Sequence, residues 1–182
     1  IDLLKKGGVG VLGTDTIYGL VGSALRPETV GRIYKLQGRD PGKPMIILIS
    51  SLQDLDIFKI KIDDNSQQAL FKLWPGKVSV VLPCPNFKFK YLHRGTKTLA
   101  FRLPQKEELI NLLRETGPLV APSANLEGKE PAKTIEEAKN YFGDKVDFYL
   151  DEGELDSLPS TLVAIENGKL VVKRNGEVNV IE

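Results

Sequence analysis

The stretch Gly117-Pro118-Leu119-Val120-Ala121-Pro122-Ser123-Ala124-Asn125 predicts a buried strand that ends in a polar turn. Its apolar run, 118–121, is bounded by turn-forming residues, which is typical of a strand inside an α/β sheet. The hydroxyl of Ser123 and the carboxamide of Asn125 follow directly after that run. Open α/β sheets bind ligands at such strand ends. We therefore interpret the stretch as part of a site, with an ordinary exit from strand to loop as the alternative.

Two more predicted strand ends carry hydroxyl groups: Gly13-Thr14-Asp15-Thr16-Ile17-Tyr18-Gly19-Leu20 and Leu158-Pro159-Ser160-Thr161-Leu162-Val163. Around them, apolar periodicity and turn residues predict strands at 9–12, 78–82, 98–103, 146–150, 161–165 and 170–173, and helices at 27–38, 52–58, 65–74, around 109–113 and at 134–143. Asn167-Gly168 is a strong hairpin signal. The alternation favours a single α/β domain over residues 1–182, with a twisted sheet of parallel and antiparallel strands and flanking helices.

The composition is that of an ordinary globular protein and excludes several kinds of site. No apolar run approaches the roughly 18 residues that a membrane span needs, so we expect no membrane contact and a cytoplasmic protein. Cys84 is the one cysteine and His93 the one histidine, which excludes an internal disulfide and sites built from several of either. The 25 basic residues are balanced by 24 acidic ones, so any cationic site must be local.

Basic and hydroxyl side chains gather at the predicted element ends. The set comprises Arg39, Lys43, Arg102, Arg174, Thr16, Thr98, Ser123 and Ser160. Thr98 and Arg102 share one face of their strand, where an arginine is costly to bury without an anion. Such a set suits phosphoryl or adenylyl transfer, in which positioning and charge neutralisation supply most of the catalysis. The alternative is that each group caps a turn or is a solvated charge.

The opening motif Gly13-Thr14-Asp15-Thr16-Ile17-Tyr18-Gly19-Leu20 resembles the P-T-E-T-V-Y-G-L sequence of the YrdC/TsaC family, the threonylcarbamoyl-AMP synthases. The resemblance continues, in order, through Gly38-Arg39, Lys43-Pro44, Trp74-Pro75-Gly76, Phe101-Arg102-Leu103-Pro104, Ala121-Pro122-Ser123-Ala124-Asn125, Pro159-Ser160-Thr161 and Lys173-Arg174-Asn175-Gly176. Each motif is modest alone, but together they are specific and cover nearly the whole chain. The chain looks like the short, single-domain form of this family.

The resemblance implies a YrdC-like fold and a nucleotidyltransferase activity, L-threonylcarbamoyladenylate synthase. Such enzymes join L-threonine, bicarbonate and ATP into threonylcarbamoyl-AMP and release pyrophosphate. The product feeds threonylcarbamoyladenosine modification of tRNA through downstream threonylcarbamoyl transferase proteins. Contact with tRNA or double-stranded RNA is a further implied interaction.

The resemblance also implies roles for individual residues. Threonine is expected on Thr16, Arg102, Ala121 and Ser160. ATP is expected on Arg39, Lys43, Thr98, Ser123 and Arg174. The expected catalytic set is Arg39, Lys43, Ser123 and Asn125. Mg²⁺ is expected with the phosphates, and no residue of this chain is assigned to a metal.

Three positions depart from the family pattern, and one of them is Leu48, which stands where longer relatives often have histidine. The usual K-x-R reads Gln37-Gly38-Arg39, so one phosphate-facing cation is missing unless Lys35 or Lys43 supplies it. Glu127 replaces the common small residue in S-A-N-x-S-G. The departure at Gln37 bears on activity, because a neutral amide cannot replace a positive charge.

Two other functions remain open. Related domains of hydrogenase-maturation HypF proteins make carbamoyl-AMP, but those chains carry cysteine-rich zinc fingers that a single cysteine cannot build. The other alternative is a catalytically weak module that binds nucleotide, tRNA or double-stranded RNA. Gln37 slightly favours such a module, whereas the retained site residues favour the enzyme: Arg102, Ser123, Asn125 and Ser160.

Overall fold

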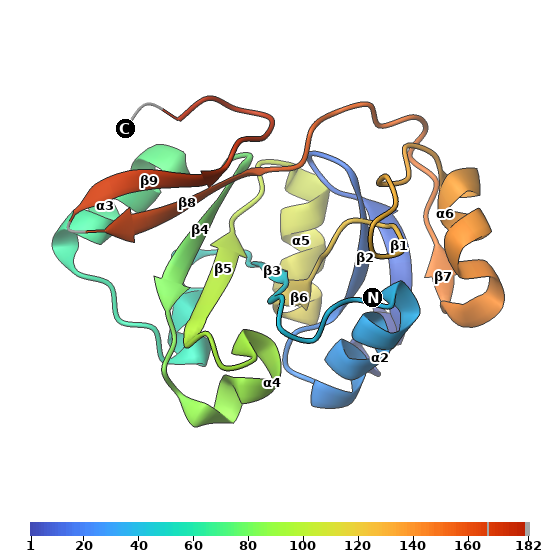
Figure 1. Ribbon diagram of the computed structural model, residues 1–182, viewed down its shortest axis with the longest axis horizontal. Coiled ribbons are helices and arrows are strands. Elements are labelled where there is room, and N and C mark those ends of the chain that lie inside the picture. The colour runs from blue at the N-terminus through green and yellow to red at the C-terminus, as the bar shows by residue number, and fades with distance from the viewer. Residues whose placement is uncertain (167, 181–182) are drawn as a thin grey trace.

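A mixed sheet with flanking helices organises the chain in the computed structural model, which describes residues 1–166 and 168–180 (Figure 1). Its strands are β1 Val9–Gly13, β2 Tyr18–Ser23, β3 Ile46–Leu48, β4 Val78–Pro83, β5 Thr98–Arg102, β6 Leu119–Val120, β7 Phe148–Tyr149, β8 Thr161–Glu166 and β9 Lys169–Arg174. They lie in the order β7-β1-β2-β6-β3-β5-β4-β8-β9. The predicted fold class is confirmed.

The sheet contains both parallel and antiparallel pairs. The pairs β1–β7, β3–β5 and β4–β8 are parallel. The pairs β1–β2, β2–β6, β3–β6, β4–β5 and β8–β9 are antiparallel. The mixture places the ends of β1, β5 and β6 near the start of β8, where the predicted site residues lie.

The helices cover the sheet because its central strands are apolar on both faces. The helices are α1 Asp2–Lys5, α2 Pro27–Gln37, α3 Asp64–Leu73, α4 Lys90–His93, α5 Glu107–Thr116 and α6 Ile135–Phe142, with 3₁₀ turns at Leu52–Phe58, Phe87–Phe89 and Gly143–Lys145. Leu12 and Val21 share a buried cluster with side chains of α1 and α5, whereas Val11 and Leu20 share one with side chains of α2. In the described part of the chain, no helix has the length and apolar character to cross a membrane.

Three local predictions differ from the structure. Residues 52–58 form a 3₁₀ helix rather than an α-helix, because Asp54 N–H bonds Ser51 O three residues back and its carboxylate binds Ser50. The strand expected over 146–150 is only Phe148–Tyr149, although the N–H groups of Asp147 and Leu150 also donate to carbonyls of β1. The sequence Thr134-Ile135-Glu136-Glu137 also predicts a capping box, in which the first and last residues accept from each other's N–H groups. Thr134 does accept from Glu137 N–H, but the Glu137 carboxylate accepts from Lys133 N–H.

The C-terminal hairpin is present, and the chain after it packs tightly on the segment that leads into β8. Asn167 lies outside the described residues, while Gly168 has the positive φ of 75° that such a turn requires. Beyond β9, Glu177 N–H donates to Pro159 O at 2.9 Å. A Cβ added to Gly176 would lie 2.2 Å from Pro159 O and 2.6 Å from the carbonyl carbon of Ser160. Glycine at 176 therefore allows two backbone segments to meet beside Ser160.

We expect Gly176→Ala to lower the free energy of unfolding by roughly 1–3 kcal/mol, the usual cost of inserting a methyl group into a packed contact. The obstacle is backbone, which cannot rotate away as a side chain can. Urea denaturation followed by the fluorescence of the single tryptophan, Trp74, measures the change.

Gly31→Ala is the matched control for this substitution. Gly31 lies inside α2, and a Cβ there meets no atom within 4 Å. Alanine is favoured over glycine in a helix by about 0.8–1 kcal/mol, so this variant is expected to be as stable as wild type or more stable. Equal stability of Gly176→Ala and wild type would contradict the close approach.

Candidate active site

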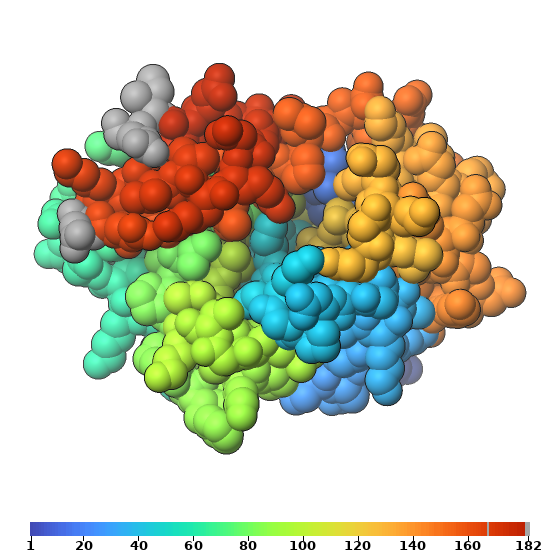
Figure 2. Space-filling view, viewed as in Figure 1, coloured from blue at the N-terminus to red at the C-terminus, as the bar shows by residue number. Residues whose placement is uncertain are grey.

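Two adjoining cavities lie at the strand ends that the sequence singled out. The larger has a volume of about 430 Å³, within the range of small-molecule sites, and the deeper one has about 30 Å³. Ile46 and Arg174 line both. Figure 2 shows the surface hollowed between the red C-terminal hairpin and the cyan loop of residues 39–44.

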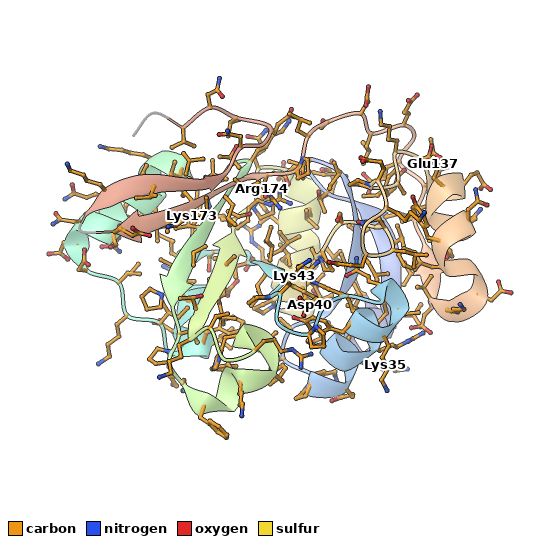
Figure 3. All side chains as sticks on the ribbon, viewed as in Figure 1. Lys35, Asp40, Lys43, Glu137, Lys173 and Arg174 are labelled. Carbon is orange, nitrogen blue, oxygen red and sulfur yellow. The ribbon has the colours of Figure 1, made fainter. Side chains whose placement is uncertain are left out.

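The larger cavity combines apolar walls with a basic rim. Val81, Ala100 and Leu162 come from β4, β5 and β8 and form part of the walls. Thr98, two residues before Ala100 on β5, adds a hydroxyl group. The basic residues are Arg39 and Lys43 from the loop after α2 and Arg174 from the end of β9. Figure 3 shows Lys43 and Arg174 at the centre of the molecule, between these elements.

The deep cavity is lined by all four residues that the family resemblance assigns to threonine: Thr16, Arg102, Ala121 and Ser160. They come from the β1–β2 turn, the end of β5, the residue after β6 and the residue before β8. The cavity by itself holds about one water molecule. A larger ligand that reaches Arg102 must therefore also occupy the boundary at Ile46 and Arg174.

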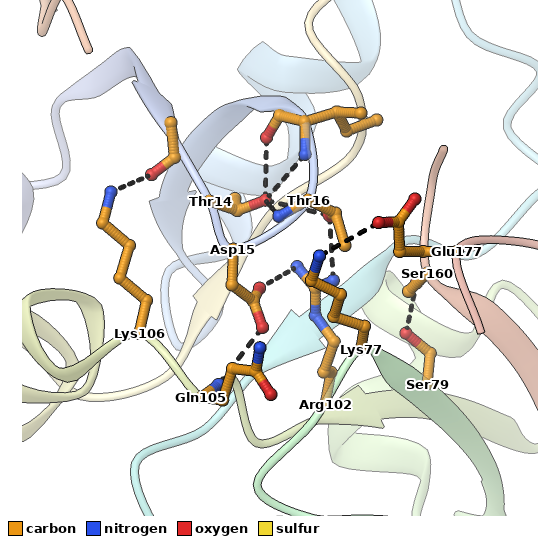
Figure 4. Close-up of polar contacts among 12 residues, drawn as sticks. Thr14, Asp15, Thr16, Lys77, Ser79, Arg102, Gln105, Lys106, Ser160 and Glu177 are labelled. Carbon is orange, nitrogen blue, oxygen red and sulfur yellow. Dashed lines mark hydrogen bonds and ion pairs between the residues drawn. The ribbon is translucent and has the colours of Figure 1, made fainter. Parts of the chain in front are cut away.

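The β1–β2 turn is organised by the buried hydroxyl of Thr14. This Oγ1 donates to Ile17 O at 2.7 Å and accepts from the N–H groups of Thr16 and Ile17 at 3.2 and 3.3 Å. The turn fixes Thr16, whose side-chain oxygen accepts from Arg102 Nη1 at 3.0 Å (Figure 4). A local sequence feature, a threonine two residues before another, thus sets one partner of the buried arginine.

Arg102 already has an anion in the structure, and that anion is Asp15. The side chains of Arg102 and Asp15 are 5% and 3% exposed, and Nη2 lies 3.2 Å from Oδ1 without hydrogen-bond geometry. Asp15 Oδ2 accepts from Gln105 N–H at 3.1 Å. Burial lowers the pKa of the Arg102 guanidinium and Asp15 opposes that shift, while Arg174 adds to it. The sequence predicted that Arg102 needs an anion but did not identify this internal partner.

Within the described residues, Arg102 Nε has no hydrogen-bond partner although it is buried. Unpaired buried donors of this kind are rare and costly. A ligand carboxylate in the deep cavity is an acceptor of suitable charge for a guanidinium.

Arg174 connects the two cavities. Its Nη2 donates to Ser160 O at 2.8 Å, which fixes the guanidinium beside the threonine-assigned residues. Burial lowers the pKa of Arg174, and the positive charge of Arg39 lowers it further. Both guanidinium groups line the larger cavity, where they can act on one polyanion.

The Ser123–Asn125 loop borders the cavities without lining them. Ala121 and Pro122 contribute to the walls, whereas Ser123 Oγ donates to Asn125 Oδ1 at 2.5 Å. Asn125 Nδ2 donates to the carbonyls of Leu126 and Lys129. In this arrangement the polar groups of the loop satisfy one another and hold its shape.

The expectation for Gln37 is corrected by the structure. We expected a phosphate-facing position that lacks a cation, but Gln37 is only 3% exposed. Its Nε2 donates to Ser123 O at 2.7 Å and to Asn125 O at 3.1 Å. Lys35 is exposed on α2 and lies away from Lys43 in Figure 3. Gln37 is thus a support for the loop.

The two cations of the 39–44 loop are also paired internally. Arg39 Nε and Nη2 donate to the carbonyls of Lys43 and Pro44, at 3.1 and 3.0 Å. Lys43 Nζ lies 2.5 Å from Glu127 Oε1, and Arg39 Nη1 lies 3.9 Å from Glu127 Oε2. Two cations that line the larger cavity therefore contact a carboxylate that the sequence analysis did not assign to the site.

The segment 150–160 connects β7 to β8 (Figure 1), and its last two residues, Pro159 and Ser160, line the deep cavity. Tyr18 OH donates to Gly153 O at 2.7 Å and accepts from Glu152 N–H at 2.9 Å. Lys106 forms an ion pair with Glu152. The segment then delivers Ser160, whose Oγ shares a hydrogen bond of 2.8 Å with Ser79 Oγ.

Sequence reasoning missed four residues of this neighbourhood: Asp15, Tyr18, Gln37 and Glu127. Asp15 and Tyr18 stand inside the quoted opening motif, and Glu127 and Gln37 were noted only as departures from a pattern. A buried arginine on β5 is a signal that an acidic residue must be found for it. No comparable signal identifies which acid that is, or which cations Glu127 contacts.

Comparison with known proteins identifies relatives of the whole described region. The family model Sua5_yciO_yrdC, described as Telomere recombination, matches residues 2–176. A Pyrococcus abyssi protein named threonylcarbamoyl-AMP synthase is 30% identical over 176 residues, 95% of this chain and 52% of that protein. The threonylcarbamoyl-AMP synthase of Thiobacillus denitrificans is 30% identical over 171 residues, 92% of this chain and 90% of that protein.

Solved structures show the same fold. The crystal structure of P. abyssi Sua5 complexed with L-threonine has a TM-score of 0.88 and 29% identity, over 96% of this chain and 52% of that one. E. coli YciO has a TM-score of 0.84 and 25% identity, over 96% of this chain and 86% of that one. This chain thus spans about half the length of the P. abyssi relative. With the match over residues 2–176, the chain belongs to the Sua5/YciO/YrdC family.

Proposed function

We propose that this chain is an L-threonylcarbamoyladenylate synthase, which forms threonylcarbamoyl-AMP and pyrophosphate from L-threonine, bicarbonate and ATP. The observation that carries the proposal is Arg174, which lines both a larger cavity with a basic rim and a deep cavity that contains Arg102. Two substrates that react with each other need binding sites that meet, and these two cavities meet at Arg174. The names of relatives with 30% identity support the same activity.

The deep cavity suits the amino acid. Arg102 provides a guanidinium whose Nη1 and Nη2 are fixed by Thr16 and Asp15. A carboxylate that reaches the guanidinium gains a charge-assisted hydrogen bond, which is stronger than a neutral one. Ser160 and Ala121 complete the enclosure. L-Threonine bound to the P. abyssi structure supports this choice of substrate.

The larger cavity suits the nucleotide. Its apolar walls can receive a base, and Thr98 offers a hydroxyl group. Arg39, Lys43 and Arg174 can then meet the phosphates. Because Arg174 also lies at the deep cavity, the α-phosphate has a path to the amino acid.

The chemistry needs positioning and charge more than a protein nucleophile. Bicarbonate takes up a proton and loses water to give carbon dioxide. The threonine amine adds to the carbon dioxide, loses a proton and becomes a carbamate. A carbamate oxygen then attacks the α-phosphorus, the bond to the β-phosphate oxygen breaks, and pyrophosphate leaves. Arg39, Lys43 and Arg174 offset the negative charge that grows on the phosphate oxygens. In this scheme Ser123 and Asn125 maintain the loop beside the reacting groups.

Mg²⁺ is expected to accompany the nucleotide, because this ion keeps several waters and is commonly held by substrate phosphates. The described residues contain no group of three or more His, Cys, Asp or Glu side chains arranged to hold a metal ion. Further roles in tRNA modification, including delivery of the product to downstream transferase proteins, belong to the same proposal.

The proposed reaction is tested by incubating the protein with ATP, Mg²⁺, L-threonine and labelled bicarbonate. Pyrophosphate release that requires threonine, together with a labelled adduct of AMP, is the expected result. A protein that binds ATP but forms neither product would be a nucleotide-binding module, and the proposed function would be wrong.

We expect Arg102→Lys to weaken threonine binding by about tenfold or more while ATP binding changes by less than about twofold. Lysine keeps the charge next to Asp15 but lacks the planar guanidinium, whose N–H groups on separate nitrogens match a carboxylate, and such charged hydrogen bonds contribute roughly 1.5–3 kcal/mol. Titration calorimetry with each ligand separates the two effects. Arg114→Lys, on the exposed side of α5, is the control. Equal weakening for both ligands would assign Arg102 to the fold instead.

Arg174→Gln is expected to affect both ligands, because Arg174 lines both cavities. The loss of a guanidinium from the phosphates predicts turnover about a hundredfold lower, which corresponds to roughly 2.7 kcal/mol in the transition state. Steady-state pyrophosphate release at saturating substrates measures it. Arg32→Gln, which removes a surface ion pair with Asp147, is the matched control. Turnover near the wild-type level in Arg174→Gln would contradict the role given to this residue.

A further inference from the structure

We propose that Glu127 is a built-in competitor for the phosphate-binding cations, so that ATP enters the larger cavity against the charge of the protein's own carboxylate. The inference rests on the proposed function, since it concerns the same nucleotide site. It adds an affinity-setting residue at a position where the family pattern has a small side chain.

The contacts of Glu127 are with the two cations of the 39–44 loop. Its Oε1 lies 2.5 Å from Lys43 Nζ and its Oε2 lies 3.9 Å from Arg39 Nη1. The Glu127 side chain is 33% exposed and that of Lys43 is 57% exposed. The pair is thus on the open rim, where an incoming phosphate can displace the carboxylate.

Backbone hydrogen bonds of the segment that follows β6 hold Glu127 in this place, without help from its carboxylate. Glu127 N–H donates to Gln37 O at 2.8 Å, at the end of α2. The Gln37 amide in turn donates to Ser123 O and Asn125 O. The carboxylate is therefore free to exchange partners while the main chain stays fixed.

The charges of the rim determine what this exchange does. Arg39, Lys43 and Arg174 all line the larger cavity, and the positive charge of Arg39 lowers the pKa of Arg174. Glu127 neutralises part of this cluster in the free protein. A triphosphate that binds Lys43 must first displace the Glu127 carboxylate. It then remains close to that carboxylate, which is also negatively charged, and both effects weaken its binding.

Asp40, the carboxylate of the 39–44 loop itself, does not have the same role as Glu127. Its Oδ1 accepts from Gly42 N–H at 2.8 Å and so supports the local turn. Across 1–166 and 168–180 no ion pair joins it to a cation. The competition is therefore assigned to Glu127 alone.

The test is the affinity of Glu127→Gln for ATP and for tripolyphosphate, measured by calorimetry with and without Mg²⁺. Glutamine keeps the size of the side chain and removes its charge. We expect both ligands to bind roughly two- to fivefold more tightly than in wild type, as one partly exposed charge would give, and the gain to shrink at high salt. In a Lys43→Ala background, the gain should be smaller because the displaced partner is absent.

Glu130→Gln is the matched control. It removes the same charge from an exposed side chain that lies three residues after Glu127. Thermal denaturation checks that each variant folds, and Glu127→Ser, which restores the small residue of the family pattern, must reproduce the gain. Unchanged or weaker ATP binding by Glu127→Gln without Mg²⁺ would overturn the inference. Weaker binding that appears only with Mg²⁺ would also overturn it, because Glu127 would then be a partner of the ion. If wild type binds ATP and only the expected gain is missing, the proposed function stands. If neither protein binds ATP, both proposals are wrong.

Discussion

The buried ion pair of Asp15 and Arg102 is the interaction on which the site depends. An unpaired guanidinium at the end of β5 would cost several kcal/mol, so the strand can end in arginine only because the β1–β2 turn brings a carboxylate to it. In the sheet order, β6 and β3 lie between β2 and β5. The pair therefore joins two parts of the sheet that are not neighbours, and the deep cavity lies beside the contact.

Cations at the larger cavity are also paired with a carboxylate, but the pairing there is weaker. Arg102 is buried with its counterion, whereas Lys43 and Arg39 meet Glu127 at an open rim. A buried pair holds its partners in one geometry, because breaking it leaves a desolvated charge behind. An exposed pair is screened by water and contributes little, so a ligand can exchange with it. The two cavities thus combine a rigid group for orientation with cations that can change partners.

Packing around Ser160 explains why residues beyond the sheet belong to the site. Gly176 lets the chain after β9 contact the carbonyl of Pro159, and Tyr18 binds the preceding segment at Gly153. Ser160 is therefore placed by two segments far apart in the sequence. Arg174 donates to the same residue's carbonyl, so the position of the cation shared by the two cavities depends on this packing too.

Local patterns in the sequence determined the helices, most strands and the mixed fold class, because hydrophobic periodicity and turn residues act over a few neighbours. They also placed the polar residues at strand ends, which sheet topology then gathered into the two cavities. Only the tertiary structure decided that Asp15 forms an ion pair with Arg102, that Glu127 forms one with Lys43, and that the Gln37 side chain donates to the backbone of Ser123. Each of these contacts joins loops whose meeting depends on the order of the strands, and no local pattern carries that information.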